Sequence, residues 1–166
     1  NEVNKNIEIF IADIWYLKHS VGHSVRTIED CILKINEDSV VYTNLLDSRF
    51  IIGDKKLYKE LLQNMEDKNI WSKSKFLLEK KLEQQNRYSK FSNTGYLLEP
   101  NIKEGPGGFR DLQTLIWVAK KNFEAKSLLD LYKTNVISKK EYLALLSAER
   151  FLAKTRFLLH YIHEKP

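Results

Sequence analysis

The residues best suited to chemistry lie in one glycine-rich segment, Glu99–Gln113, which leads into an expected helix at Phe109. Gly105, Gly107 and Gly108 permit backbone conformations and close approaches that a side chain would block. The first N–H groups of a helix have no partner inside the helix, so they form a natural site for an anion. The segment therefore predicts a phosphate-binding loop, although it matches neither a Walker A loop nor the G-x-G-x-x-G pattern.

Charged side chains flank these glycines. Lys103 and Arg110 bring positive charge, and an arginine can grip a phosphate or a carboxylate with two hydrogen bonds. Glu99, Glu104 and Asp111 are placed to orient those two cations. The alternative interpretation is structural: the segment is a turn that lets two helices pack, with Arg110 and Asp111 in a buried ion pair. The residues by themselves leave both interpretations open.

A second candidate is the segment Val21–Thr27, whose residues alternate with the period of a strand. Ser24 and Arg26 share one face with Gly22, and if that face lines a cleft, Arg26 is a candidate phosphate contact. His23 falls on the opposite, apolar face, where a core histidine is a simpler interpretation than a general base. A strand needs a partner for its backbone groups, so this segment is expected to border a sheet whose other strands are mostly missing here.

Helical patterns position these two segments. Proline is absent before Pro100, so long helices can run uninterrupted. Short strands are expected at 21–27 and 50–52. Apolar residues repeat at helical spacing over 4–18, 28–35, 41–46, 57–65, 69–91, 109–123, 125–132 and 142–162. Helix caps are expected at Thr27, at Asp38 or Ser39, at Asp54 and at Ser138. Together, these patterns predict a mainly α fold with a small α/β portion near the start of the chain.

The same patterns predict which side chains are buried. Three tryptophans fall on apolar helix faces and are expected in the core: Trp15, Trp71 and Trp117. The helix pattern that Asn69 opens has a strongly charged outer face, made of Lys73, Lys75, Glu79, Lys80, Glu83 and Arg87. We expect this face to be solvated.

Composition and charge exclude several classes of protein. The 166 residues are 43% apolar and 30% charged, as in a folded globular protein, and no apolar run is long enough to span a membrane. A single cysteine excludes an internal disulfide and a cysteine-rich zinc site, and favours a cytoplasmic setting. Residues 1–52 carry a net charge of −3 and residues 53–166 one of +8. No basic–aromatic alternation indicates a nucleic-acid platform, so no nucleic-acid partner is expected.

Several stretches resemble a known family. Trp15–Thr27 and Leu98–Gln113 closely resemble the bacterial bifunctional PII uridylyltransferase/uridylyl-removing enzymes, and Leu45–Asp54 is also similar to them. Trp117–Lys120 and Glu141–His160 continue the match, so the resemblance covers nearly the whole chain in order. A shorter form of the glycine-rich motif also resembles the glutamine-synthetase adenylyltransferase. The wider nucleotidyltransferase superfamily therefore stays open as an alternative.

The resemblance implies a domain organisation. Members of this family begin with a nucleotidyltransferase domain whose paired aspartates bind metal and nucleotide, continue with a helical region, and then carry a histidine–aspartate phosphohydrolase domain. Residues 1–52 then correspond to the C-terminal part of the transferase domain, and residues 53–166 to a bundle-like helical domain. The paired aspartates would lie upstream of Asn1. The catalytic residues and the metal site are therefore expected outside this chain, which would be a piece of a longer protein and inactive alone.

The resemblance also implies an activity. The complete enzyme would use Mg²⁺ to transfer uridylyl from UTP to a tyrosine of the PII nitrogen-regulatory protein, and would remove it again. This chain would complete the nucleotide cleft and pack against the catalytic domain. Its nucleotide-binding candidates are Ser24, Arg26, Lys103, Gly105, Gly107, Gly108, Arg110 and Asp111. An alternative from another class is an interaction and packing module, which docks the transferase domain to the hydrolase domain or receives PII without touching nucleotide.

Overall fold

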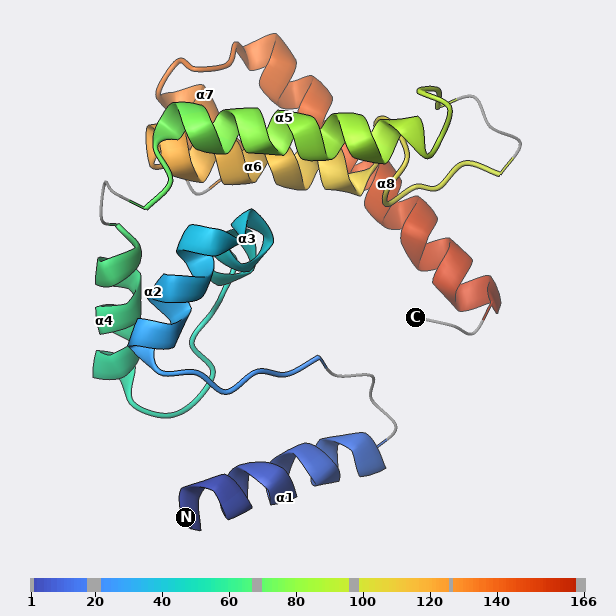
Figure 1. The fold of residues 1–166 in the computed structure, drawn as a ribbon. Helices are drawn as coiled ribbons and strands as arrows, with labels where there is room; N and C mark the ends of the chain where they lie inside the picture. Colours follow the sequence, from blue (N-terminus) through green and yellow to red (C-terminus); the bar gives the residue numbers. More distant parts are fainter. Residues whose placement is uncertain (1, 18–21, 67–69, 96–98, 126, 164–166) are drawn as a thin grey trace. The chain divides into compact units, whose positions relative to one another are not determined.

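The chain is almost entirely helical. The computed structural model describes residues 2–17, 22–66, 70–95, 99–125 and 127–163. Within them it forms eight α-helices joined by irregular segments (Figure 1). The helices are α1 (Glu2–Tyr16), α2 (Ile28–Glu37), α3 (Ser39–Leu46), α4 (Lys55–Met65), α5 (Lys73–Ser89), α6 (Phe109–Phe123), α7 (Leu128–Lys133) and α8 (Lys139–His163). The predicted mainly α class is confirmed.

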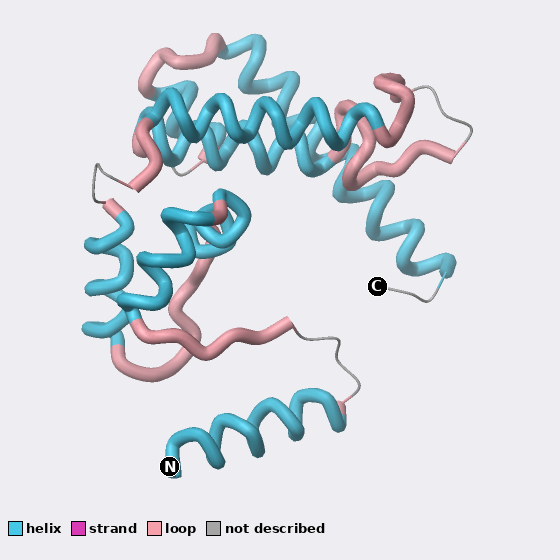
Figure 2. The backbone as a smooth tube through the Cα atoms, viewed as in Figure 1, coloured by secondary structure: helices cyan, strands magenta, loops and turns pink. Residues whose placement is uncertain are grey.

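The two expected strands are not found within the described residues. Residues 22–27 and 50–52 run as loop between helices (Figure 2), and Val21 lies outside the described residues. The prediction of an α/β remnant is therefore not supported here. Alternation along one segment says which side chains share a face, but a strand also needs a neighbouring strand for its N–H and C=O groups. The described part of the chain supplies none.

The helix starts follow the caps that the sequence predicts. Thr27 and Asp30 form a capping box, in which the Asp30 N–H donates to Thr27 Oγ1 (3.1 Å) and the Thr27 N–H to Asp30 Oδ2 (3.2 Å). The carboxylates of Asp38 and Asp54 each accept from the N–H two residues further on, at 2.7 Å. Ser138 caps α8 by the same reciprocal arrangement as Thr27. The expected helix start at Asn69 lies outside the described residues.

Two compact units make up the chain, residues 1–31 and residues 32–166. The first unit contains α1, none of whose residues is buried. Trp15 is 55% exposed and its ring meets the ring of His23 edge to face, with centroids 5.6 Å apart. The predictions of a core tryptophan and a core histidine are therefore wrong at these two positions. Within the described residues, the apolar face of this helix is at most half-buried, at Ile7, Ile11 and Ile14.

The second unit has a core built from α2, α3, α4, α5 and α6. Its buried members are Ile35, Tyr42, Met65, Ile70, Trp71, Phe76 and Trp117. The Tyr42 and Phe76 rings meet edge to face at 5.4 Å, and the Trp71 indole N–H donates to the backbone carbonyl of Ile35. The predicted core positions of Trp71 and Trp117 are confirmed.

The end of α3 is tied to the middle of α6 through one carboxylate. Asp47 accepts a hydrogen bond from the Trp117 indole N–H at 2.6 Å and forms an ion pair with Lys120. The Lys120 ammonium also donates to the carbonyl of Leu46 at 3.1 Å. These contacts matter for function because α6 begins at the glycine-rich loop, so its orientation fixes where that loop lies.

The last helix packs against α6 and α7, and further along it the Arg156 guanidinium lies over the Phe109 ring at 6.0 Å. α7 and α8 cover α6 through a small cluster of Ala119, Ala125, Leu128 and Leu131. Further along α8, the large side chains of Phe151, Phe157 and Tyr161 are exposed. None of the helices in the described part of the chain combines the length and the apolar character that crossing a membrane requires.

Replacing Phe76 with alanine should lower the free energy of unfolding by about 3 to 5 kcal/mol, because this fully buried ring leaves a cavity in the core. Leu78→Ala on the exposed side of the same helix is the matched control and should cost less than about 0.5 kcal/mol. Urea denaturation of the chain measures both. Equal decreases in the free energy of unfolding for the two variants would contradict the position of Phe76 in the core.

Candidate functional site

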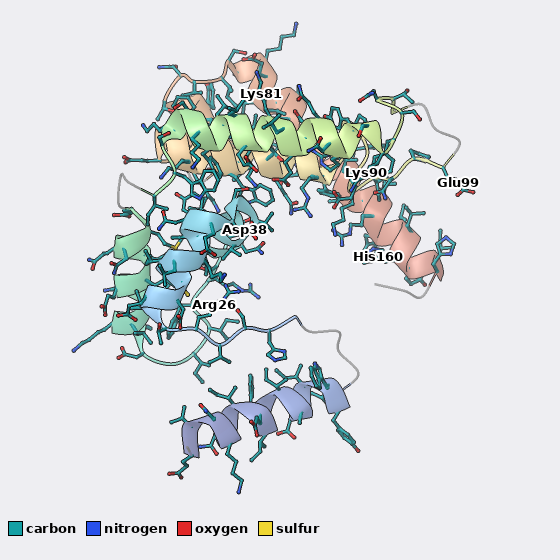
Figure 3. The ribbon with its side chains drawn as sticks, in the orientation of Figure 1. Arg26, Asp38, Lys81, Lys90, Glu99 and His160 are labelled. Atoms are coloured by element: carbon teal, nitrogen blue, oxygen red, sulfur yellow. The ribbon has the colours of Figure 1, made fainter. Side chains whose placement is uncertain are left out.

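The glycine-rich loop joins two helices that lie side by side and antiparallel. At one end the Lys73 ammonium donates to the carbonyl of Asn122 (2.8 Å), and at the other the Arg87 guanidinium is paired with Asp111. The loop must therefore reverse the chain between α5 and α6. Figure 3 labels Glu99 on this segment.

The carboxylate of Asp111 is the centre of this end of the helix pair. Its Oδ1 accepts from Arg87 Nη2 at 2.6 Å and from Gln84 Nε2 at 3.1 Å. Its Oδ2 accepts from the Tyr88 hydroxyl at 2.5 Å and from the backbone N–H of Gly107 at 2.7 Å. Three donors on α5 and one in the loop thus converge on one side chain of α6.

These donors determine the protonation state of the Asp111 carboxyl group. Burial of Asp111 raises its pKa, but the hydrogen bonds from Arg87, Tyr88, Gln84 and the Gly107 N–H outweigh burial, so the pKa lies below its ordinary value of 3.8. Burial, followed by the hydrogen bond to Asp111, raises the pKa of Tyr88. The carboxyl is therefore ionised and the phenol protonated at neutral pH, which is the state that the hydrogen-bond pattern requires.

The buried ion pair differs from the one the sequence suggested. Asp111 pairs with Arg87 of α5, whereas the structural interpretation paired it with Arg110. The prediction that Arg87 and Lys80 lie on a solvated face is also wrong, since they are only 8% and 1% exposed. Lys80 pairs with Glu83 at 2.6 Å and lies over the Trp117 ring at 5.4 Å. Burial is possible because each cation has a carboxylate partner.

A signal for this burial was present in the sequence. Lys80, Gln84 and Arg87 follow Phe76 at four, eight and eleven residues, which is the spacing of one helical stripe. Because Lys80 and Arg87 are charged, residue type alone favours a solvated face at these positions. Charged or amide residues that continue an apolar stripe can equally indicate buried pairs with a neighbouring helix.

The loop backbone is held by its own hydrogen bonds. Asn101 Oδ1 accepts from the N–H groups of Lys103 (3.0 Å) and Glu104 (2.8 Å), and the Asn101 carbonyl accepts from Gly105 (2.9 Å). The carbonyls of residues 102 and 103 then accept from the N–H groups of Phe109 and Arg110, both at 2.9 Å. The first N–H groups of α6 thus have acceptors inside the chain. Any phosphate contact therefore depends mainly on side chains.

Glycine is required at three positions of this loop for steric reasons. A Cβ on Gly105 would lie 2.7 Å from the carbonyl oxygen of Asn101, and one on Gly108 would lie 2.7 Å from that of Ile102. Gly107 has a φ of +78°, in the left-handed region. The predicted close backbone approaches are confirmed at Gly105 and Gly108.

The two loop cations share one carboxylate oxygen. Glu104 Oε1 lies 3.2 Å from Arg110 Nη2 and 3.8 Å from Lys103 Nζ. The Arg110 guanidinium also lies over the Trp117 ring at 5.5 Å. The Lys103 side chain is 51% exposed and that of Arg110 26%, so both retain access to solvent. Glu104 orients both cations as predicted, whereas Glu99 forms no ion pair with either within the described residues.

Ser24 and Arg26 belong to the first unit. Both are exposed and lie on the irregular segment that leads into α2, where Figure 3 labels Arg26. Within the second unit, the structure brings together the loop candidates, namely Lys103, Gly105, Gly107, Gly108, Arg110 and Asp111. Across the described ranges, no group of three or more His, Cys, Asp or Glu side chains could hold a metal ion. The residues described thus do not fit a Mg²⁺ site.

Comparison with known proteins identifies relatives over the whole chain. Residues 75–166 match the family model of the GlnD PII-uridylyltransferase. The chain is 40% identical over 164 residues to the bifunctional uridylyltransferase/uridylyl-removing enzyme of Hydrogenovibrio crunogenus, covering 99% of the chain and 18% of that enzyme. It is 42% identical over 159 residues to the enzyme of the same name from Pseudoalteromonas translucida (96% and 18%). For that of Haemophilus influenzae the identity is 40% over 161 residues (97% and 19%).

The chain spans about a fifth of the length of these curated relatives. No solved structure matches it.

Alanine at Gly108 should destabilise the loop by about 1 to 3 kcal/mol, because the new methyl group would lie within 3 Å of three backbone oxygens. Gly22→Ala is the matched control, since a Cβ there meets nothing within 4 Å. Urea denaturation reports the two free energies of unfolding. A neutral Gly108→Ala would contradict the loop geometry.

Asp111→Asn should lower the free energy of unfolding by about 2 kcal/mol at pH 7, because the amide cannot accept from all four donors. The native pKa lies below 3.8, so the stabilisation is present above that pH and is lost as the pH falls through the native pKa. The difference between the wild-type chain and the variant should therefore shrink in acid. Asp13→Asn, on the exposed surface of α1, is the control. A difference that stays constant from pH 7 to pH 2 would contradict the assigned charge.

Proposed function

Since the chain belongs to the GlnD PII-uridylyltransferase family, we propose that it is part of an enzyme that transfers uridylyl from UTP to the PII protein and removes it again. The family model covers more than half of the chain, and the relatives carry both activities in their name. In this proposal the enzyme works in the cytoplasm. Residues 1–52 close its transferase domain and residues 53–166 form the helical domain that follows.

The loop at residues 99–111 completes the nucleotide cleft through its cations. The observation that carries this role is the shared contact of Lys103 and Arg110 with Glu104 Oε1, which holds two cationic side chains beside one another on the loop. Phosphate oxygens of UTP would accept from the outward N–H groups of both side chains. Gly105, Gly107 and Gly108 shape the loop rather than carry charge.

Asp111 acts in this proposal as a positioning residue. It would hold the loop against α5 and would not touch the nucleotide, because both of its oxygens already accept two hydrogen bonds each. Ser24 and Arg26 are proposed as further nucleotide contacts from the first unit. The Mg²⁺ ligands of the transferase would belong to a part of the enzyme outside this chain.

A second candidate function is packing or docking without nucleotide contact. Large apolar side chains are exposed on α1 (Phe10, Trp15) and on α8 (Phe157, Tyr161), as in a segment that other domains cover. Titration calorimetry with UTP, beside a pull-down with PII, separates the two functions. PII capture without UTP heat favours docking, and UTP heat favours the cleft.

Arg110→Ala in a complete enzyme should raise KM for UTP about tenfold or more, because a charge-assisted hydrogen bond to phosphate is lost. Arg110→Lys should restore part of the affinity. Arg150→Ala, an exposed arginine of α8, is the matched control and should leave KM unchanged. Circular dichroism checks that each variant is folded. A normal KM, or loss of the fold in place of a KM effect, would contradict the binding role.

A further inference from the structure

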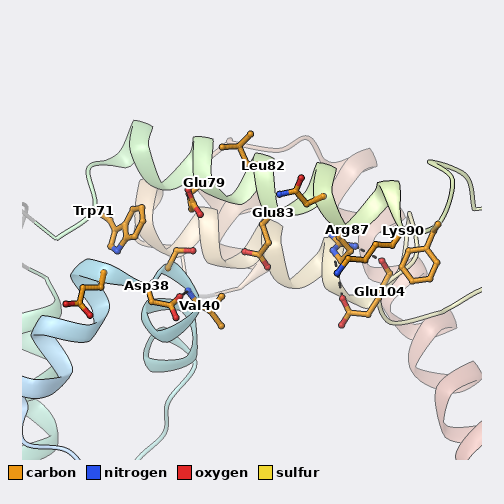
Figure 4. Close-up of a pocket in the computed structure, with 13 residues that line it drawn as sticks. Asp38, Val40, Trp71, Glu79, Leu82, Glu83, Arg87, Lys90 and Glu104 are labelled. Atoms are coloured by element: carbon orange, nitrogen blue, oxygen red, sulfur yellow. Dashed lines mark hydrogen bonds and ion pairs between the residues drawn. The ribbon is translucent and has the colours of Figure 1, made fainter.

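The carboxylate of Glu104 lies among three cations. Its Oε1 is 3.2 Å from Arg110 Nη2 and 3.8 Å from Lys103 Nζ, and its Oε2 is 4.0 Å from Arg87 Nε. Of these three distances, the first alone is short enough for a hydrogen bond. Figure 4 shows Glu104 of the loop beside Arg87 of α5. One carboxylate is therefore shared between two cations of the loop and one buried cation of the neighbouring helix.

The buried cation has a donor without an acceptor. Arg87 is only 8% exposed, and its two terminal nitrogens donate to Asp111 Oδ1 (2.6 Å) and to the backbone carbonyl of Glu104 (2.8 Å). Its Nε–H has no hydrogen-bond partner within the described residues and is closed to solvent. A buried donor without a partner is unfavourable. Because a ligand cannot reach this atom from outside, an acceptor for it has to come from the protein, and Glu104 Oε2 lies next to it.

Glu104 can reach this donor without a change of its backbone. Its N–H donates to Asn101 Oδ1 and its carbonyl accepts from Arg87 Nη1, both at 2.8 Å, so the main chain is held on both sides. The side chain is partly exposed and is not enclosed by packing. Its Oε2 has to move only about 1 Å to come within hydrogen-bond distance of Arg87 Nε. Rotation of the side chain supplies a shift of this size.

We propose that Arg87 is a positioning residue of the nucleotide site and acts through Glu104. Without nucleotide, Glu104 Oε1 stays with Arg110 and Lys103. When phosphate oxygens accept from these two cations, the Glu104 carboxylate moves to Arg87 Nε–H and forms the missing hydrogen bond. The move takes negative charge away from the phosphates and satisfies a buried donor, so both effects favour phosphate binding. This inference rests on the proposed binding of nucleotide by the loop.

The movement of Glu104 can be tested in the chain itself, without nucleotide. The double variant Lys103→Met/Arg110→Met leaves the Glu104 carboxylate without its partners on the loop, and NMR of the arginine Nε–H groups then follows Arg87. The Arg87 Nε–H signal should shift downfield, and its exchange with solvent should be at least about tenfold slower than in the wild-type chain, because a hydrogen bond to a charged group forms. Adding Glu104→Met to the double variant should abolish both changes.

Lys139→Met/Lys140→Met is the matched control, because it removes two positive charges from exposed positions at the start of α8. It should leave the Arg87 signal unchanged, and circular dichroism checks that every variant is folded. An unchanged Arg87 signal in the double variant would overturn the proposal. An equal change in the control, or a change that survives Glu104→Met, would do the same, since neither could come from the carboxylate.

Kinetics of a complete enzyme test the positioning role. Arg87→Lys keeps the charge but loses the Nε–H donor, so it should raise KM for UTP at least about threefold more with Glu104 in place than in a Glu104→Met background. Its effect on kcat should stay below about twofold, because the role is in binding. Equal increases of KM in both backgrounds would mean that Arg87 only supports the fold, against the proposal.

The two levels of the proposal fail in different ways. A normal KM for Arg110→Ala would overturn nucleotide binding by the loop, and this inference with it. A raised KM for Arg110→Ala together with an unchanged Arg87 signal in the double variant would leave nucleotide binding intact and overturn the role of Arg87 alone.

Discussion

The hydrogen-bonded pair of Arg87 and Asp111 is the interaction on which the rest of this site depends. A carboxylate at the start of α6 can be partly buried as an anion only if donors surround it, and α5 supplies three of the four. Those donors bring the end of α5 against the start of α6, so the segment between the two helices has to reverse the direction of the chain. The glycine-rich loop lies at the end of this segment, where the Gly107 N–H donates to the same carboxylate.

In this loop the backbone determines the shape, and two side chains carry the positive charge. Its backbone N–H groups bond within the chain, and Gly105 and Gly108 allow carbonyl oxygens to approach closer than any side chain would permit. The charge is left to two side chains, Lys103 and Arg110, which one glutamate orients. A loop whose backbone is hydrogen-bonded within the chain can present its cations in a defined geometry, which is what recognition of a triphosphate by a catalytic cleft would need.

Local features of the fold could be predicted from the sequence, and features that depend on a distant partner could not. Caps such as those at Thr27 and Asp38 involve residues two or three apart, so residue types alone indicate them. The burial of Lys80 and Arg87 depends on which helix lies opposite them. Their charge alone favours exposure to solvent, whereas both are buried. Alternation around Ser24 suggested a strand, but no neighbouring strand is present in the described residues. The loop could be found because its glycines and charges are close in sequence.

A double-mutant cycle between Arg87→Met and Asp111→Asn tests the central claim most directly, because it isolates the interaction of the two side chains from their other contacts. The free energies of unfolding of the wild-type chain, both single variants and the double variant are measured in urea at pH 7. The buried pair predicts a coupling energy of about 1.5 kcal/mol or more. Additive losses, with a coupling energy near zero, would contradict the account that this pair organises the helices and the loop.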